Sequence, residues 1–246
     1  MIDYNSYKYS REELLKYTII GLSVTSMIAY LFYKSIIVVI LFSPACFIYL
    51  RKKKKMLMEK RKWQLNLEFR EGLISLSAAL NAGYSIENAI REAVHDLQLM
   101  YDNESLIIKE FEYIVTQLSM NKTVEEALKE FALRSNVEDI SNFAEIFTTA
   151  KRTGGDIIKI IKTTSKNIGD KIEIKRQIIT MITAKKFEAN IMNLIPFGII
   201  LYLWISTPGF LDPLYHNIFG NMIMTITLAL YFLAYKVSEK IMDINV

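Results

Sequence analysis

Few residues in this chain have the chemistry that catalysis or metal binding requires. There are two histidines, His95 and His216, and one cysteine, Cys46. No segment of the form GxxxxGK[ST] is present, so the sequence lacks the phosphate-binding loop of an ATPase. The Gly154-Gly155 pair is followed by Asp156, whose negative charge would repel phosphate. We therefore expect a protein that is not an enzyme and that uses no cofactor.

The acidic residues of the centre form the other group with chemical potential, because they could bind a basic partner. Residues 87–145 carry thirteen Asp or Glu against five Lys or Arg, whereas residues 151–186 carry ten Lys or Arg against three Asp or Glu. A solvated surface that keeps a domain soluble would have the same composition. The candidate docking residues are the acids predicted to lie on exposed helix surfaces, namely Glu87, Glu92, Glu125, Glu126 and Glu130. Those at 125 and 126 also fall in the first turn of a predicted helix, where negative charge is favourable.

Four apolar runs form two pairs around this charged centre. Residues 17–33 and 35–50 make the first pair, and residues 187–206 and 218–235 make the second. Crossing a bilayer takes about 20 helical residues, with about 17 as the lower limit. We expect four transmembrane helices in two hairpins. Because the first two runs are short and only Lys34 separates them, a re-entrant hairpin that does not cross remains the alternative.

Basic residues flank all four runs on the same side. Lys and Arg beside membrane segments stay in the cytoplasm and are attracted to anionic lipid. The two connecting loops carry only Lys34 in one case and Asp212 and His216 in the other. The membrane-surface residues are those next to the second and third runs: Arg51, Lys52, Lys53, Lys54, Lys55, Lys185 and Lys186. Both termini and the centre are therefore predicted to be cytoplasmic, in a multi-pass protein of the inner membrane.

This topology divides the chain into five parts. They are a cytoplasmic segment 1–16, a first hairpin 17–50, a helical domain 51–186, a second hairpin 187–235 and a tail 236–246. It also places His95 and His216 on opposite sides of the membrane, so the two cannot share a metal ion. The basic tract 51–55 lacks interleaved aromatic residues, which favours lipid over nucleic acid as its partner.

The central domain should be entirely helical. Apolar residues recur at spacings of three and four, as in Leu73, Leu76 and Leu80, and no stretch alternates for long enough to indicate a strand. Gly83 should end one helix in the left-handed conformation, and the turn at Gly154-Gly155 should require glycine. Thr123 with Glu126 forms a capping box, and Ser85 and Asp156 should also cap helices. The fold class is all-α, with an antiparallel bundle of about six helices.

Several segments resemble the type II secretion system F domain. Residues 76–90 resemble its opening helix, glycine and capped second helix, and residues 153–157 are similar to its Gly-Gly corner. Ala184-Lys185-Lys186 followed by Pro196 resembles its exit into the membrane. Residues 208–214 are similar to the outside loop of the Tad-type branch. The resemblance covers about 66–240. One departure is Glu68-Phe69-Arg70-Glu71, where many relatives have a proline.

The resemblance implies a TadB/TadC-like platform protein of a Tad (Flp) pilus or a related type II secretion-like machine. Its expected partners are a secretion ATPase, pilin subunits, and a second F-type platform protein or another copy of itself. Two alternatives are a membrane sensor with a helical relay domain and a small transporter. The outside loop 207–217 is short for a sensor, and the middle of each apolar run holds no acidic or basic residue of the kind that lines a transport pathway.

Overall fold

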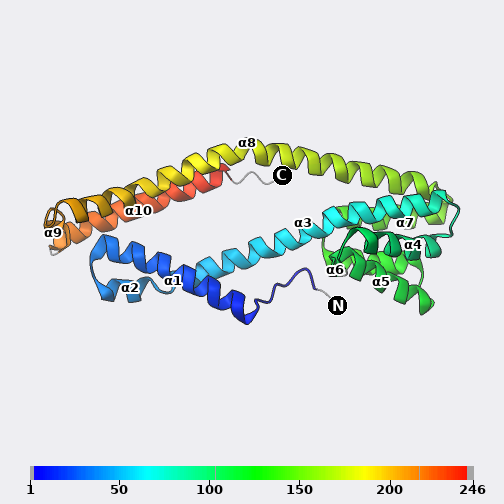
Figure 1. The fold of residues 1–246 in the computed structure, drawn as a ribbon, viewed down its shortest axis with the longest axis horizontal. Coiled ribbons are helices and arrows are strands. Elements are labelled where there is room, and N and C mark those ends of the chain that lie inside the picture. Colours follow the sequence, from blue (N-terminus) through cyan, green and yellow to red (C-terminus); the bar gives the residue numbers. More distant parts are fainter. Residues whose placement is uncertain (1–2, 103, 216, 243–246) are drawn as a thin grey trace. The chain divides into compact units, whose positions relative to one another are not determined.

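The computed structural model describes residues 3–102, 104–215 and 217–242, and within them it contains helices and no strand (Figure 1). The predicted all-α class is confirmed. The helices, in chain order, are α1 (Arg11–Tyr33), α2 (Ile36–Phe42), α3 (Ala45–Asn81), α4 (Ile86–Met100), α5 (Leu106–Ser119), α6 (Val124–Ser135), α7 (Glu138–Thr153), α8 (Ile157–Ser206), α9 (Asp212–Tyr215) and α10 (Ile218–Met242).

The chain divides into two compact units. The helical unit comprises residues 54–174 together with the chain up to Lys8, and the membrane unit comprises residues 9–53 and the chain from Lys175 onward. The expected domain borders at residues 51 and 186 lie inside the continuous helices α3 and α8. Each of these two helices therefore contains both part of an apolar run and part of the charged centre, with no loop between them.

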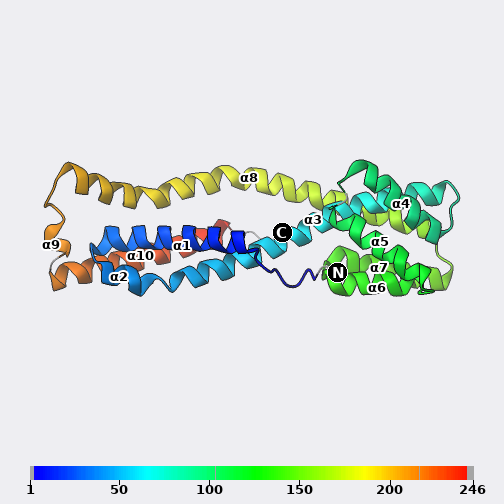
Figure 2. The ribbon, with the colours of Figure 1, turned by 60° about the horizontal axis from the view of Figure 1, so that its bottom comes forward.

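The core of the helical unit is built from α4–α7 and the adjoining parts of α3 and α8 (Figure 2). Phe69 of α3 lies at its centre, with ring centroids 6.0 Å from Phe131 of α6 and 5.6 Å from Phe143 of α7. A Cβ atom added at Gly72 would lie 2.9 Å from the ring of Phe111, so this glycine lets α3 and α5 approach closely. Packing of apolar faces, with no disulfide to help, is what holds the unit together.

The predicted helix ends are confirmed at the residues that carry them. Thr123 accepts a hydrogen bond from the Glu126 N–H, and the Glu126 carboxylate accepts one from the Thr123 N–H. Ser85 and Asp156 cap α4 and α8 through their side-chain oxygens. Gly83 and Gly154 have φ values of +91° and +76°, the left-handed conformation that favours glycine.

Gly155 differs from Gly154, because its φ is not in the left-handed region. A side chain at this position would meet a tight contact instead. A Cβ atom at Gly155 would lie 3.2 Å from the Ala150 Cβ, in the last turn of α7. Our expectation that the turn conformation itself requires glycine therefore applies to Gly154 alone.

In the membrane unit, three of the described helices are long and apolar enough to cross a bilayer: α1, α8 and α10. The second apolar run, residues 35–50, is not a single helix. It is divided into α2 and the start of α3 by a turn at Ser43-Pro44. Pro44 has no N–H to donate to the preceding turn, and its ring crowds the carbonyl four residues before it. The fourth expected transmembrane helix is therefore absent as one continuous element.

The end of α1 packs against the second hairpin within this unit. The Tyr215 hydroxyl donates to the Leu31 carbonyl at 2.8 Å, and the Tyr33 and Thr225 hydroxyls are 2.9 Å apart. Nearby, the Lys34 ammonium lies 3.3 Å from an Asp212 carboxylate oxygen and 5.3 Å from the centre of the Tyr215 ring. The tip of the first hairpin is thus fixed to the connection between α8 and α10.

Candidate functional site

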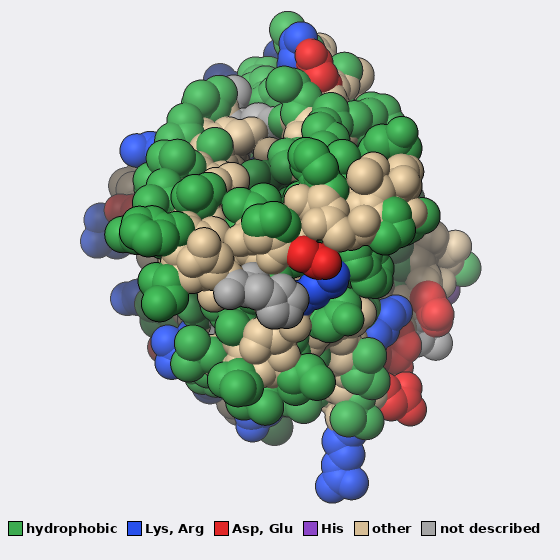
Figure 3. Space-filling model, turned by 90° about the vertical axis from the view of Figure 1, so that its left-hand side faces the viewer, with side chains coloured by type: hydrophobic (Ala, Val, Ile, Leu, Met, Phe, Trp, Pro, Cys, Tyr) green, Lys and Arg blue, Asp and Glu red, His purple; other side chains and the backbone are tan. Residues whose placement is uncertain are grey.

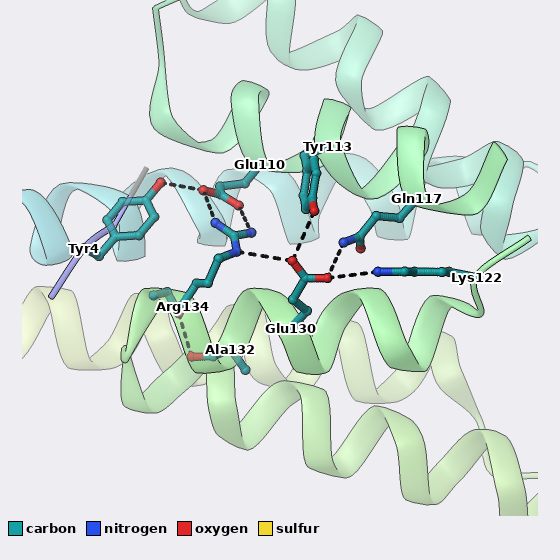
Figure 4. Close-up of polar contacts among 9 residues, drawn as sticks. Tyr4, Glu110, Tyr113, Gln117, Lys122, Glu130, Ala132 and Arg134 are labelled. Carbon is teal, nitrogen blue, oxygen red and sulfur yellow. Dashed lines mark hydrogen bonds and ion pairs between the residues drawn. The ribbon is translucent and has the colours of Figure 1, made fainter. Parts of the chain in front are cut away.

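A buried ion pair joins α5 and α6 in the helical unit (Figure 4). The Glu110 side chain is only 3% exposed, and its two oxygens accept hydrogen bonds from the Arg134 guanidinium at 3.0 and 2.5 Å. The Tyr4 hydroxyl, from the start of the chain, donates to the same carboxylate at 2.9 Å. Burial opposes the charge on Arg134, but its hydrogen bonds to Glu110 outweigh this and raise the pKa of Arg134. A two-pronged pair of this kind fixes the register of the two helices.

Glu130 extends this ion pair into a network along α6 (Figure 4). Its carboxylate accepts hydrogen bonds from the Tyr113 hydroxyl at 3.2 Å, the Lys122 ammonium at 3.3 Å and the Gln117 amide. Partial burial opposes ionisation, yet these donors hold the pKa of Glu130 below its ordinary value. The stability that they provide is present at neutral pH and is lost as the pH falls through this lowered pKa.

The three candidate docking acids on α6 therefore all accept hydrogen bonds from other residues of the domain. Besides Glu130, Glu125 accepts a hydrogen bond from the Lys151 ammonium of α7 at 2.9 Å, and Glu126 closes the capping box with Thr123. Burial opposes the charge of Glu125, but the Lys151 contact keeps its pKa lowered. Both Glu125 and Glu126 lie in the first turn of α6, as expected, and Glu126 caps the helix.

The two candidate acids on α4 lie in a different setting. Glu87 is exposed in the first turn, and Glu92 is half-buried beside His95 and Asp96. The possible ligand atoms of Glu92, His95 and Asp96 lie within 4.8 Å of one another, although surface acids are often grouped in this way without an ion. The acids of α4 are therefore the candidates with negative charge left for a partner.

Two buried acids, Glu68 and Glu110, were not among the residues predicted from the sequence. Glu68 of α3 accepts hydrogen bonds from the Ser105 hydroxyl at 2.8 Å and the Ile107 N–H at 3.0 Å, so it caps the start of α5. Glu110 pairs with Arg134, as described above. A signal for Glu110 was available, because it lies three residues after Ile107 and four before Ile114, on the apolar face of its helix. Acids in such positions need a buried partner.

Four of the predicted membrane-surface basic residues form ion pairs or aromatic contacts within the membrane unit. Lys52 pairs with Glu239 of α10, the Lys53 ammonium lies 5.2 Å from the centre of the Tyr17 ring, and Lys185 lies 3.0 Å from Glu188. The guanidinium of Arg51 lies over the ring of Phe47 at 4.5 Å. Contacts of cations with aromatic rings at the ends of apolar helices are typical of the membrane interface.

The features so far define an all-helical protein whose core domain continues into apolar helices able to cross a membrane. Residues 73–205 match the family described as type II secretion system (T2SS), protein F. This match covers more than half of the 246 residues, and the chain belongs to that family. It runs from within α3 through α4–α7 to nearly the end of α8, so the matched part contains most of the helical core and one candidate span. Neither the curated proteins nor the solved structures gave a match.

Proposed function

We propose that this protein is a non-enzymatic platform protein of the inner membrane, in a Tad (Flp) pilus or a related type II secretion-like machine. In this role a secretion ATPase in the cytoplasm performs the chemistry, and the platform passes the resulting motion to pilin subunits in the bilayer. A second F-type platform protein, or another copy of this chain, completes the assembly.

The observation that carries this proposal is the continuity of α8. It is one helix of 50 residues, and Ile161 and Ile168 at its start are buried in the helical core. Its later part, residues 187–206, is the apolar run of the second hairpin. A platform that transmits force needs an element shared by its cytoplasmic and membrane parts, and nearly all of α8 lies within the family match at 73–205.

We further propose that both hairpins cross the membrane and that the helical unit is cytoplasmic. The first hairpin meets the second through Lys34 and Asp212 at one end, and through Lys52 and Glu239 at the other. Between these ends, residues 218–235 of α10 would rise about 27 Å, close to the thickness of the hydrocarbon core. The two ion pairs thus support a common depth for both hairpins. The end that carries α9 presents few charged side chains (Figure 3), and a scarcity of Lys and Arg is typical of loops on the outer side.

A labelling experiment tests the crossing of the first hairpin. In a Cys46→Ala background, a Ser35→Cys variant should react with a membrane-impermeant maleimide added to the outside of intact cells stripped of their outer membrane. We choose Ser35 because substitution there leaves the Lys34–Asp212 pair intact. A matched Lys8→Cys variant should react only after permeabilisation. If position 35 also reacts only after permeabilisation, the first hairpin is re-entrant.

Charge reversal on α4 tests the docking of a basic partner. Replacing Glu87 and Glu92 together by Lys should weaken binding of the secretion ATPase to the full-length protein by about tenfold at low salt, because two attractions become repulsions. High salt should reduce the difference by screening. We select these acids because reversal at Glu125 or Glu130 would also break contacts inside the domain.

The control is Asp170→Lys, which reverses one exposed acid on α8 and so makes half the change in net charge of the double α4 variant. Binding should be measured by co-sedimentation with vesicles that contain the platform protein. Equal binding by the α4 variant and the unaltered protein at low salt would contradict an acidic docking surface on this helix.

A further inference from the structure

The first residues of the chain belong to the helical unit, although the next helix belongs to the membrane unit. The segment up to Lys8 is grouped with residues 54–174, whereas α1 begins at Arg11 in the other unit. Only Tyr9 and Ser10 lie between Lys8 and the start of α1. The N-terminal segment is therefore a third covalent link between the units, besides the continuous helices α3 and α8.

Tyr4 is the buried side chain among residues 3–8, and it anchors this link. Tyr4 is fully buried and belongs to the same apolar cluster as Leu65 and Phe69 of α3. Its hydroxyl reaches Glu110 in the interior, as Figure 4 shows. The neighbours on both sides of the anchor, Asp3 and Asn5, are exposed.

Two further contacts tie the segment to α3 at solvent-accessible positions. Asn5 accepts a hydrogen bond from the Lys62 ammonium at 3.0 Å, and the Arg61 guanidinium lies 4.7 Å from the centre of the Tyr7 ring. Asp3 bonds only within the segment, to the Asn5 N–H and the Ser6 hydroxyl, so this turn can persist when the segment is detached. Several residues must be ordered to bury one side chain, so the net free energy of attachment is small. A small attachment free energy is typical of segments that open locally.

The site that Tyr4 occupies keeps its charges paired without it. Both oxygens of Glu110 are bonded to Arg134, and Arg134 also lies 3.7 Å from Glu130. Departure of the tyrosine therefore leaves no unpaired buried charge, which is the event that would make release costly. The hydroxyl contributes one hydrogen bond to an ionised acceptor, and this bond favours the attached state.

We propose that residues 3–8 form a releasable strap, anchored by Tyr4 on the Glu110–Arg134 pair, which ties the start of the first membrane helix to the helical unit. With the strap attached, three chain segments connect the two units. With it released, α3 and α8 alone connect them, and the helical unit gains freedom to move. The strap follows from the contacts of Tyr4 and does not depend on the proposed function.

Fluorine NMR of the full-length protein in lipid nanodiscs tests the strap. A fluorotyrosine placed at position 4 should give a major resonance shielded from a soluble gadolinium chelate and a minor one broadened by it, with exchange between them detected by saturation transfer. Fluorophenylalanine at the same position lacks the hydroxyl and should raise the ratio of released to attached strap about tenfold or more. A Lys8→Ala variant, at an exposed position of the same segment, should change this ratio by less than about twofold.

Four results would overturn the strap. A single shielded resonance with both probes would make Tyr4 a permanent core residue, and a single exposed resonance would mean that it does not dock. An unchanged ratio with fluorophenylalanine would remove Glu110 as the anchor point. Hydrogen exchange of α5 and α6 separates release from unfolding: it should stay within about threefold of the unaltered protein, because opening is local. Loss of protection in both helices would also contradict the proposal.

Discussion

Replacing Arg134 by methionine should destabilise the helical unit by about 3–5 kcal/mol, because it leaves the Glu110 carboxylate buried without its partner. The carboxylate is 3% exposed and accepts both prongs of the guanidinium. Tyr4 is its other neighbour and supplies one hydroxyl, which cannot balance a full charge. Methionine keeps much of the bulk of arginine, so loss of charge pairing is the main change.

The measurement is urea unfolding of the full-length protein in detergent, followed by Trp63 fluorescence. Trp63 packs against the core of the helical unit, and a Trp204→Phe background removes the signal of the membrane unit. The double variant Arg134→Met with Glu110→Met should recover at least half of the loss, since an apolar pair of similar volume needs no charge partner. A single variant as stable as the unaltered protein would show that Glu110 is hydrated or protonated in solution.

Truncation of Phe131 to alanine should cost about 3–5 kcal/mol in the same assay, through a cavity at the centre of the core. Phe131 is fully buried, and its ring packs edge-on against Phe69. The same helix offers a matched control two residues later, because Leu133 is 72% exposed. Leu133→Ala should change stability by no more than about 0.5 kcal/mol. Equal losses at both positions would mean that α6 buries a different face.

These two changes affect a domain whose outline is visible in the sequence and whose interior is not. Gly83, Thr123 and Gly154 act through their own backbone or the next turn, so their types alone predict where helices begin and end. The acids on α6 show the limit of such reasoning. Glu125 and Glu130 look alike as exposed charges in sequence, but one contacts Lys151, 26 residues away, and the other a network from α5.

The membrane segments show the same division. Charge and hydropathy identify the apolar runs, because transfer into lipid depends on composition and length. Composition does not reveal that Pro44 divides the second run, that α3 and α8 continue through the expected domain borders, or that Lys34 and Asp212 meet. Continuity and pairing depend on what surrounds each residue in space.

By itself, the sequence determined the helical class, the helix ends and the family resemblance, which the family match confirms at residues 73–205. These properties arise from periodicity and from contacts between residues close in the chain. Only the tertiary structure decided which charged residues are paired inside the domain and which remain available to a partner. The pairing of Tyr4 with Glu110 spans 106 positions, and no local pattern encodes a contact made at that separation.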